Sequence, residues 1–159
     1  MNGWRQLGLF ALVALPACTP TPRPSDAEIY GLVVEAVADA VDAPLPVRLH
    51  PRLMQRPQEG ETLDQGTYNA FDSTTVPDLA RRHDALVLCA LSTVGSCVVP
   101  EGGVAIALSE MQELGVNGVG VGALVTDGRP DRAPQRYATV RVKPGGRGWE
   151  VVAVEWRGP

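Results

Sequence analysis

The segment from Ser25 to Val41 constrains the fold more than any other part of this 159-residue chain. Ser25 and Glu28 have the spacing of a capping box, in which each side chain bonds the other residue's backbone N–H at the start of a helix. Apolar residues then recur at intervals of three and four, which predicts an amphipathic helix with one apolar stripe against a core. The stripe comprises Ile29, Leu32, Val33, Ala36, Val37, Ala40 and Val41.

The other face and the end of this helix are also marked in the sequence. Glu35, Asp39 and Asp42 lie away from the stripe and are expected to face water. Pro44 and Pro46 follow, and proline ends a helix because it lacks a backbone N–H.

After residue 98 the sequence takes on the character of β-strands. Four segments rich in valine and aromatic residues are separated by Gly, Pro and Asp. The turn at 144–148 makes the last two an antiparallel hairpin. A helix followed by such a meander predicts an α+β domain, with an N-terminal amphipathic helix packed on a C-terminal antiparallel sheet. The four segments are 104–108, 119–126, 137–143 and 149–156.

The chain between helix and meander is less regular. Val47 to Leu49 is a plausible short strand, whereas residues 50–77 are polar and lack sustained periodicity. Residues 76–83 can form a short helix with a proline early in it, and the apolar run 86–91 fits either a helix or a strand.

The closing strand carries a Gly-x-Trp-x-Val pattern at Gly148, Trp149 and Val151. Together with the order of helix and meander, this pattern resembles cystatin-like and nuclear-transport-factor-2-like domains of small envelope proteins. The resemblance implies a curved sheet that can enclose a pocket with the helix. Tyr30, Trp149 and Trp156 would line that pocket.

The first 17 residues read as an export signal. Arg5 and the amino terminus supply positive charge, and residues 7–15 form an apolar run about half as long as a membrane-spanning helix requires. The run ends in Leu15-Pro16-Ala17-Cys18, which resembles the lipobox of bacterial lipoproteins, although Pro16 replaces the usual small residue. The resemblance implies acylation of Cys18 and cleavage before it. An ordinary secreted protein cut after Ala17 is the alternative.

These signals divide the chain into three parts. Residues 1–17 form the lipoprotein signal peptide, residues 18–28 the lipidated cysteine with a proline-rich tether, and residues 29–159 a single α+β domain. Several acyl chains on Cys18 would hold the protein on membrane lipid. Thr19, in place of an aspartate, resembles the outer-membrane form of the sorting signal, so the domain is expected to face the periplasm or the surface.

The two remaining cysteines, Cys89 and Cys97, form an even pair with seven residues between them. In an oxidising compartment such a pair is expected to form a disulfide. The Cys-x-x-Cys spacing typical of redox catalysis is not present, and a thiol-redox role remains a weaker alternative.

The charge of the mature chain argues against a nucleic-acid partner. Loss of Arg5 with the leader leaves 13 basic residues against 18 acidic ones, a net charge of about −5, whereas phosphate backbones require clustered positive charge. Arg129, Arg132 and Arg136 lie close together in the sequence. Asp127 and Asp131 lie in the same segment and lower its net positive charge, so it is expected to be a solvated loop.

No group of residues specifies a reaction. His50 and His83 are the two histidines, and no serine lies in a Gly-x-Ser-x-Gly nucleophile turn. The glycines of segment 115–122 lack the Lys-Ser/Thr of a phosphate loop, and they are expected to form a turn and a tightly packed strand. The carboxylates of the polar excursion show no sign of convergence. They are Glu59, Glu61, Asp64 and Asp72.

The sequence therefore predicts a non-enzymatic envelope lipoprotein without a metal or cofactor. Its domain would bind another envelope component, such as a protein partner. The alternative is a small-ligand or enzymatic pocket between helix and sheet.

Overall fold

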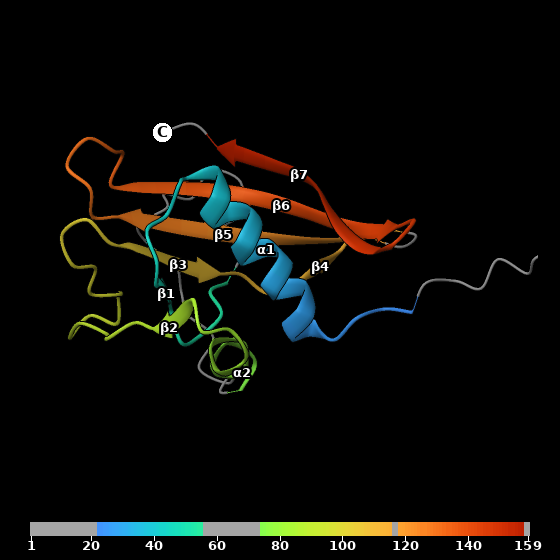
Figure 1. Ribbon diagram of the computed structural model, residues 1–159, viewed down its shortest axis with the longest axis horizontal. Helices are drawn as coiled ribbons and strands as arrows, with labels where there is room; N and C mark the ends of the chain where they lie inside the picture. The colour runs from blue at the N-terminus through green and yellow to red at the C-terminus, as the bar shows by residue number, and fades with distance from the viewer. Residues whose placement is uncertain (1–21, 56–73, 116–117, 158–159) are drawn as a thin grey trace, which may run out of the picture.

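The computed structural model describes residues 22–55, 74–115 and 118–157. Within them the fold is mixed α/β, with two helices and a seven-stranded, mostly antiparallel sheet (Figure 1). The helices are α1 (Asp26–Ala40) and α2 (Thr75–Arg82). The strands are β1 (Val47–Leu49), β2 (Leu86–Leu88), β3 (Val104–Leu108), β4 (Gln112–Glu113), β5 (Val119–Asp127), β6 (Gln135–Gly145) and β7 (Gly148–Arg157).

Helix α1 begins with the predicted capping box. The Ser25 backbone N–H donates to Glu28 Oε2 at 2.7 Å, and the Glu28 N–H donates to Ser25 Oγ at 3.4 Å. The Ser25 hydroxyl also donates to Glu28 Oε2 at 2.7 Å, and the bonds from this hydroxyl and from the Ser25 N–H lower the pKa of Glu28 because they stabilise its ionised carboxylate. At the other end the chain leaves the helix through Asp42, whose φ of 51° is left-handed.

The buried face of α1 differs slightly from the predicted stripe. Tyr30 and Val34 are buried, whereas Ala40 is exposed and its prediction as a core residue was wrong. Burying Tyr30 and Val34 removes more apolar surface from water than burying alanines does, which favours this rotation of the helix. Glu35 and Asp39 face water as predicted.

The antiparallel part of the sheet runs in the order β3, β5, β6, β7. All four predicted strand segments are confirmed, with small extensions at their ends. The predicted hairpin is also confirmed, since Gly145 pairs with Gly148 where β6 turns into β7. Strand β4 pairs with β5 and was not predicted.

The other side of the sheet is parallel. Strand β1 pairs in parallel with both β2 and β3, so the sheet is not only a C-terminal meander. The predicted short strand and short helix are present as β1 and α2, and the run 86–91 contributes β2. Residues 56–73, most of the predicted polar excursion, lie outside the described residues.

The main core lies between α1 and one face of the sheet. Figure 1 shows α1 lying across this face, with α2 beside the parallel strands. Alternate residues of the central strands, such as Ile106, Val121 and Val140, point toward Val33 and Val37 of α1. Among the described residues no helix combines the length and the apolar character that crossing a bilayer requires.

The opposite face of the sheet carries a second, smaller apolar cluster formed by Met54, Ala107, Leu124 and Tyr137. The two faces of the sheet therefore have different roles. One holds the main core. On the other, β3 and β5 are also buried, and the exposed surface lies along β6 and β7.

Candidate functional site

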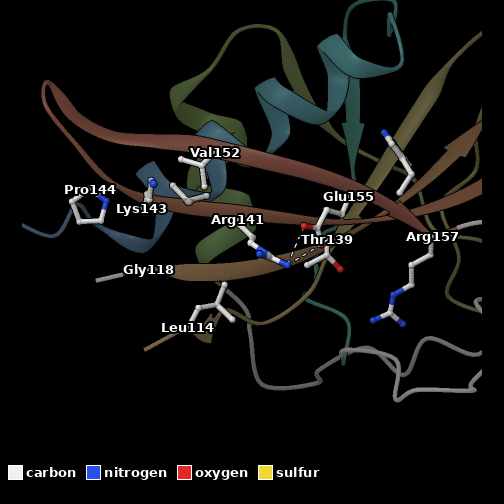
Figure 2. A pocket seen from close by; sticks show the side chains of 11 residues that line it. Leu114, Gly118, Thr139, Arg141, Lys143, Pro144, Val152, Glu155 and Arg157 are labelled. Carbon is white, nitrogen blue, oxygen red and sulfur yellow. Dashed lines mark hydrogen bonds and ion pairs between the residues drawn. The ribbon is translucent and has the colours of Figure 1, made fainter. Parts of the chain in front are cut away.

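A groove lies on the sheet face that points away from α1. Along β6, Val140 and Val142 pack into the main core, so Thr139, Arg141 and Lys143 lie on the opposite face. The groove has a volume of about 890 Å3 (Figure 2). It is lined by Leu114, Gly118, Thr139, Arg141, Val142, Lys143, Pro144, Val152, Glu155, Trp156 and Arg157.

A β-bulge shapes the floor of this groove. Arg141 pairs with Ala153 and Val142 pairs with Val151, so Val152 is an extra residue in β7. Val152 is exposed, and so is Leu114 on the other side of the groove. The groove therefore has apolar walls around its charged floor.

Gly120 makes room for the Leu114 wall. A Cβ atom at residue 120 would lie 3.2 Å from Leu114 Cδ1, so a larger residue would displace the leucine side chain. The Leu114 N–H donates to the Gly118 carbonyl at 2.9 Å and holds the start of β5 beside it. Glycine at 120 thus positions one wall of the groove.

Three cations and one carboxylate lie along the groove. Arg141 and Glu155 form an ion pair of 3.0 Å in which both side chains are about half exposed. The Arg157 guanidinium stacks over the Tyr137 ring, 5.2 Å from its centroid. Lys143 is exposed and has no ion-pair partner in the described part of the chain. Because exposed ion pairs contribute little energy, these cations are available to an anionic ligand.

Ser109 and Gly122 lie beside Tyr137 of the smaller apolar cluster. The Gly122 N–H donates to Ser109 Oγ at 2.7 Å, and the Ser109 hydroxyl donates to the Glu110 carbonyl at 2.9 Å. Ser109 is fully buried, so this hydroxyl has a structural role. The close approaches at Gly120 and Gly122 confirm the predicted tightly packed strand.

The two histidines occupy different environments. His50 is buried, with Nε2 2.9 Å from the Gly95 carbonyl and Nδ1 3.2 Å from the Arg52 backbone nitrogen. Nδ1 also lies 3.0 Å from the Arg52 carbonyl oxygen, so the ring is held between Gly95 and the Arg52 backbone. His83 is exposed after α2, near Gly31 of α1.

Cys89 and Cys97 form a disulfide, in agreement with the pairing expected from the sequence. The loop that it closes is also held by backbone bonds, such as the one from the Ser92 N–H to the Ser96 carbonyl at 2.8 Å. The Ser92 and Ser96 hydroxyls contact each other at 2.9 Å. His50 ties this loop to the chain after β1 through Gly95.

Arg129 was expected in a solvated loop, and this prediction was wrong. Its guanidinium donates to both carboxylate oxygens of Asp127 at 2.8 and 2.7 Å, and to the backbone carbonyls of Val41 and Asp42 at 2.7 Å each. Helix α1 has no basic residue in its last turn, so Arg129 supplies the cation that the C-terminal end of a helix favours. The sequence signal is the Asp-x-Arg spacing at the end of β5.

The same contacts set the ionisation of this pair. The Asp127 side chain is fully buried, and the bond from Arg129 lowers the pKa of Asp127 despite the opposing effect of burial. In turn, Asp127 raises the pKa of Arg129. Both groups stay charged near neutral pH and join β5 to the end of α1.

The three predicted pocket residues do not line one common cavity. Tyr30 is buried in the main core, where its hydroxyl donates to the Ser109 carbonyl at 3.1 Å. Trp156 packs against the main core, with Arg136 over its ring at 4.8 Å, and it also borders the groove described above. Trp149 instead borders a second groove of about 620 Å3 beside α1, together with Leu32 and Leu86.

Several predicted positions lie outside the described residues. They are Cys18, Glu59, Glu61, Asp64 and Asp72. Within the described ranges, no three His, Cys, Asp or Glu side chains come together to hold a metal ion.

Comparisons with protein families, characterised proteins and solved structures found no match for this chain. Functional inference therefore depends on the geometry of the chain itself.

Proposed function

We propose that this protein is a non-enzymatic binding domain of the bacterial envelope, anchored in a membrane by lipid on Cys18. The observation that carries the proposal is the groove on the outer face of the sheet, which combines exposed cations with apolar walls. Such a surface suits an amphipathic anionic component of the envelope.

The chemistry of the groove favours binding over catalysis. General acid–base catalysis uses groups whose pKa values are shifted by burial or by close charges. In the groove, Lys143 is exposed, and Arg141 and Glu155 form an ion pair that is half exposed to water. The buried Ser109 hydroxyl already donates to a backbone carbonyl.

Two features support the envelope location. Residues 15–18 resemble a lipobox behind a signal core, which implies a diacylglycerol thioether and an added acyl chain such as palmitate on Cys18. The disulfide between Cys89 and Cys97 is typical of an oxidising compartment such as the periplasm. We assign the outer membrane because Thr19 follows the acylated position.

The arrangement of α1 on β5, β6 and β7 supports a cystatin-like or nuclear-transport-factor-2-like domain. Folds of this kind host unrelated functions, so the assignment concerns architecture alone.

The anchor is tested by comparing the full chain with Cys18→Ala in the native bacterium. We expect the wild type to fractionate with membranes and to have a mature mass that includes three acyl chains on residue 18. Cys18→Ala should lose the acyl mass and become soluble, and Thr21→Ala, a matched change in the tether, should behave as wild type. Equal partition of Cys18→Ala and wild type, or an unmodified mature mass, would refute the anchor.

A second candidate function is binding of a small apolar ligand in the groove beside α1. Its walls include Leu32, Leu45 and Leu86, and the Trp149 indole N–H is buried without a hydrogen-bond partner in the described part of the chain. Titration with apolar fluorescent probes would support this candidate if Trp149→Phe weakened binding and Trp156→Phe did not.

A further inference from the structure

We propose that the end of the domain carrying the β6–β7 hairpin faces the membrane, where Arg141, Lys143 and Arg147 bind the phosphates of anionic lipid headgroups. This inference rests on the proposed anchor and adds the orientation of the domain and the occupant of the groove.

The tether between Cys18 and the domain is too short to let the domain move far from the lipid. Five peptide units separate Cys18 from Arg23, so even a fully extended chain spans at most about 18 Å. Arg23 lies at the domain surface, since it comes two residues before the Ser25 cap of α1, and its Nη1 donates to Glu113 Oε1 of β4 at 2.7 Å. The acylated residue therefore keeps this point of the domain close to the lipid.

The hairpin lies at the same end of the molecule. In Figure 1 the described chain begins on the side where β6 turns into β7. Pro24 and Trp149 border the same groove beside α1, and Trp149 follows the hairpin turn directly. A short tether that emerges at Pro24 thus brings the hairpin toward the membrane surface.

The end of the domain that carries the β6–β7 hairpin also holds several charged side chains. Glu113 pairs with Arg23, and Glu155 pairs with Arg141. Lys143 and Arg147 are exposed and form no ion pair within the described residues, although Glu150 lies opposite Lys143 in the pairing of β6 with β7. Asp26 and Glu28 are further carboxylates at this end, but they belong to the start of α1 on the other face of the sheet. The hairpin therefore carries one cation more than Glu150 and Glu155 can balance, and in a chain that is acidic as a whole this excess favours the hairpin as the part that meets an anionic surface.

The apolar side chains of the groove fit the same occupant. Leu114 and Val152 are exposed beside Lys143 and Arg141 (Figure 2). A phospholipid presents a phosphate next to glycerol and acyl carbons, which matches cations placed beside apolar walls. A free phosphate ion offers nothing to these walls.

The test uses the lipidated full chain in vesicles with a quencher attached to the headgroups. Because Cys18 is acylated and Cys89 and Cys97 are bonded, a new cysteine is the single thiol to be labelled. Gly146→Cys places a fluorophore on the hairpin, where added side chains meet open space, and Arg132→Cys places one on the exposed β5–β6 connection. Each protein is compared in phosphatidylcholine vesicles with and without phosphatidylglycerol.

We expect stronger quenching at residue 146 than at residue 132, and a further increase at 146 when phosphatidylglycerol is present. Lys143→Glu should lower this preference for anionic vesicles by about fivefold or more, since each cation near such a surface contributes about a factor of five. Arg132→Glu carries the same change of charge and should have no effect. Salt at 1 M should abolish the difference between vesicles.

The inference would be overturned by equal quenching at the two sites or by stronger quenching at residue 132. It would also be overturned if quenching at residue 146 were the same with and without phosphatidylglycerol. A protein partner in the groove would give the last of these results. Failure of the anchor is detected first, because a chain without acyl groups would not sediment with vesicles of phosphatidylcholine alone. Unchanged thermal unfolding of the Lys143→Glu variant checks its fold.

Discussion

At the scale of single residues, Gly122 shows how closely the outer face of the sheet is packed. A Cβ atom at this position would collide with the Tyr137 hydroxyl and approach Ser109 Oγ within 3.0 Å. The Tyr137 ring can therefore cross β5 because residue 122 has no side chain. This crossing forms the smaller apolar cluster beside the groove.

We predict that Gly122→Ala lowers the free energy of unfolding by about 2–3 kcal/mol, the usual cost of overpacking a buried site. Urea denaturation followed by circular dichroism measures the change. Gly146→Ala is the matched control, since nothing lies within 4 Å of its added Cβ atom. Equal stability of the two variants would contradict the packing described here.

Asp127 is the residue that should make stability depend on pH. Its folded pKa is lowered below the ordinary value of 3.8 by the bond from Arg129, so folding favours its ionised form. The stabilisation is complete above the unfolded pKa, near pH 4, and is lost as the pH falls through the folded value. Asp127→Asn should therefore be less stable than wild type at pH 7, by about 1–2 kcal/mol, and approach it at low pH.

Denaturant titrations of both proteins between pH 2 and pH 7 measure this difference. Asp131→Asn, an exposed carboxylate of the same connection, serves as the control and should stay within about 0.5 kcal/mol of wild type. A constant gap between Asp127→Asn and wild type across the range would show that Asp127 does not titrate as proposed.

At the scale of elements, α1 is held at both ends by different means. Its start depends on a local capping box, whereas its end is bonded by Arg129 from the β5–β6 connection. The disulfide loop resembles this second case, since backbone bonds within the loop are supplemented by His50 from outside it.

For the disulfide loop we predict that Cys89→Ala with Cys97→Ala lowers the free energy of unfolding by about 2.5 kcal/mol. The bond joins residues eight positions apart and restricts the unfolded chain, and the remaining hydrogen bonds should preserve the native loop. Thermal or urea unfolding measures the change, and Ser92→Ala with Ser96→Ala is a control that removes only an exposed hydroxyl contact. Loss of the fold in the cysteine variant would instead assign the bond an essential structural role.

At the scale of the whole molecule, the two faces of the sheet differ, because one is covered by the main core and the other carries an exposed groove. The face toward α1 is filled by the main core, which includes Tyr30 and leaves that residue away from both grooves. The opposite face carries the basic groove, and the chain enters the domain at the same end as the β6–β7 hairpin. This arrangement gives the proposed lipid anchor and the proposed recognition surface a common direction.

The sequence by itself determined the features that depend on neighbouring residues. The capping box, the extent of α1, the four long strands and the hairpin were predictable, because each reflects spacings or turn residues within a few positions. The pairing of Cys89 with Cys97 belongs to this group, since the remaining cysteines form one even pair.

Only the tertiary structure decided how distant segments meet. The parallel pairing of β1 with β2 and β3, the bond from His50 to Gly95 across 45 positions, and the bonds from Arg129 to the end of α1 across 88 positions join residues far apart in sequence. The groove is likewise assembled from β6, β7 and residues beside β4 and β5. Local patterns carry no information about such contacts, because they form only when burial of the shared core selects one arrangement of the whole chain.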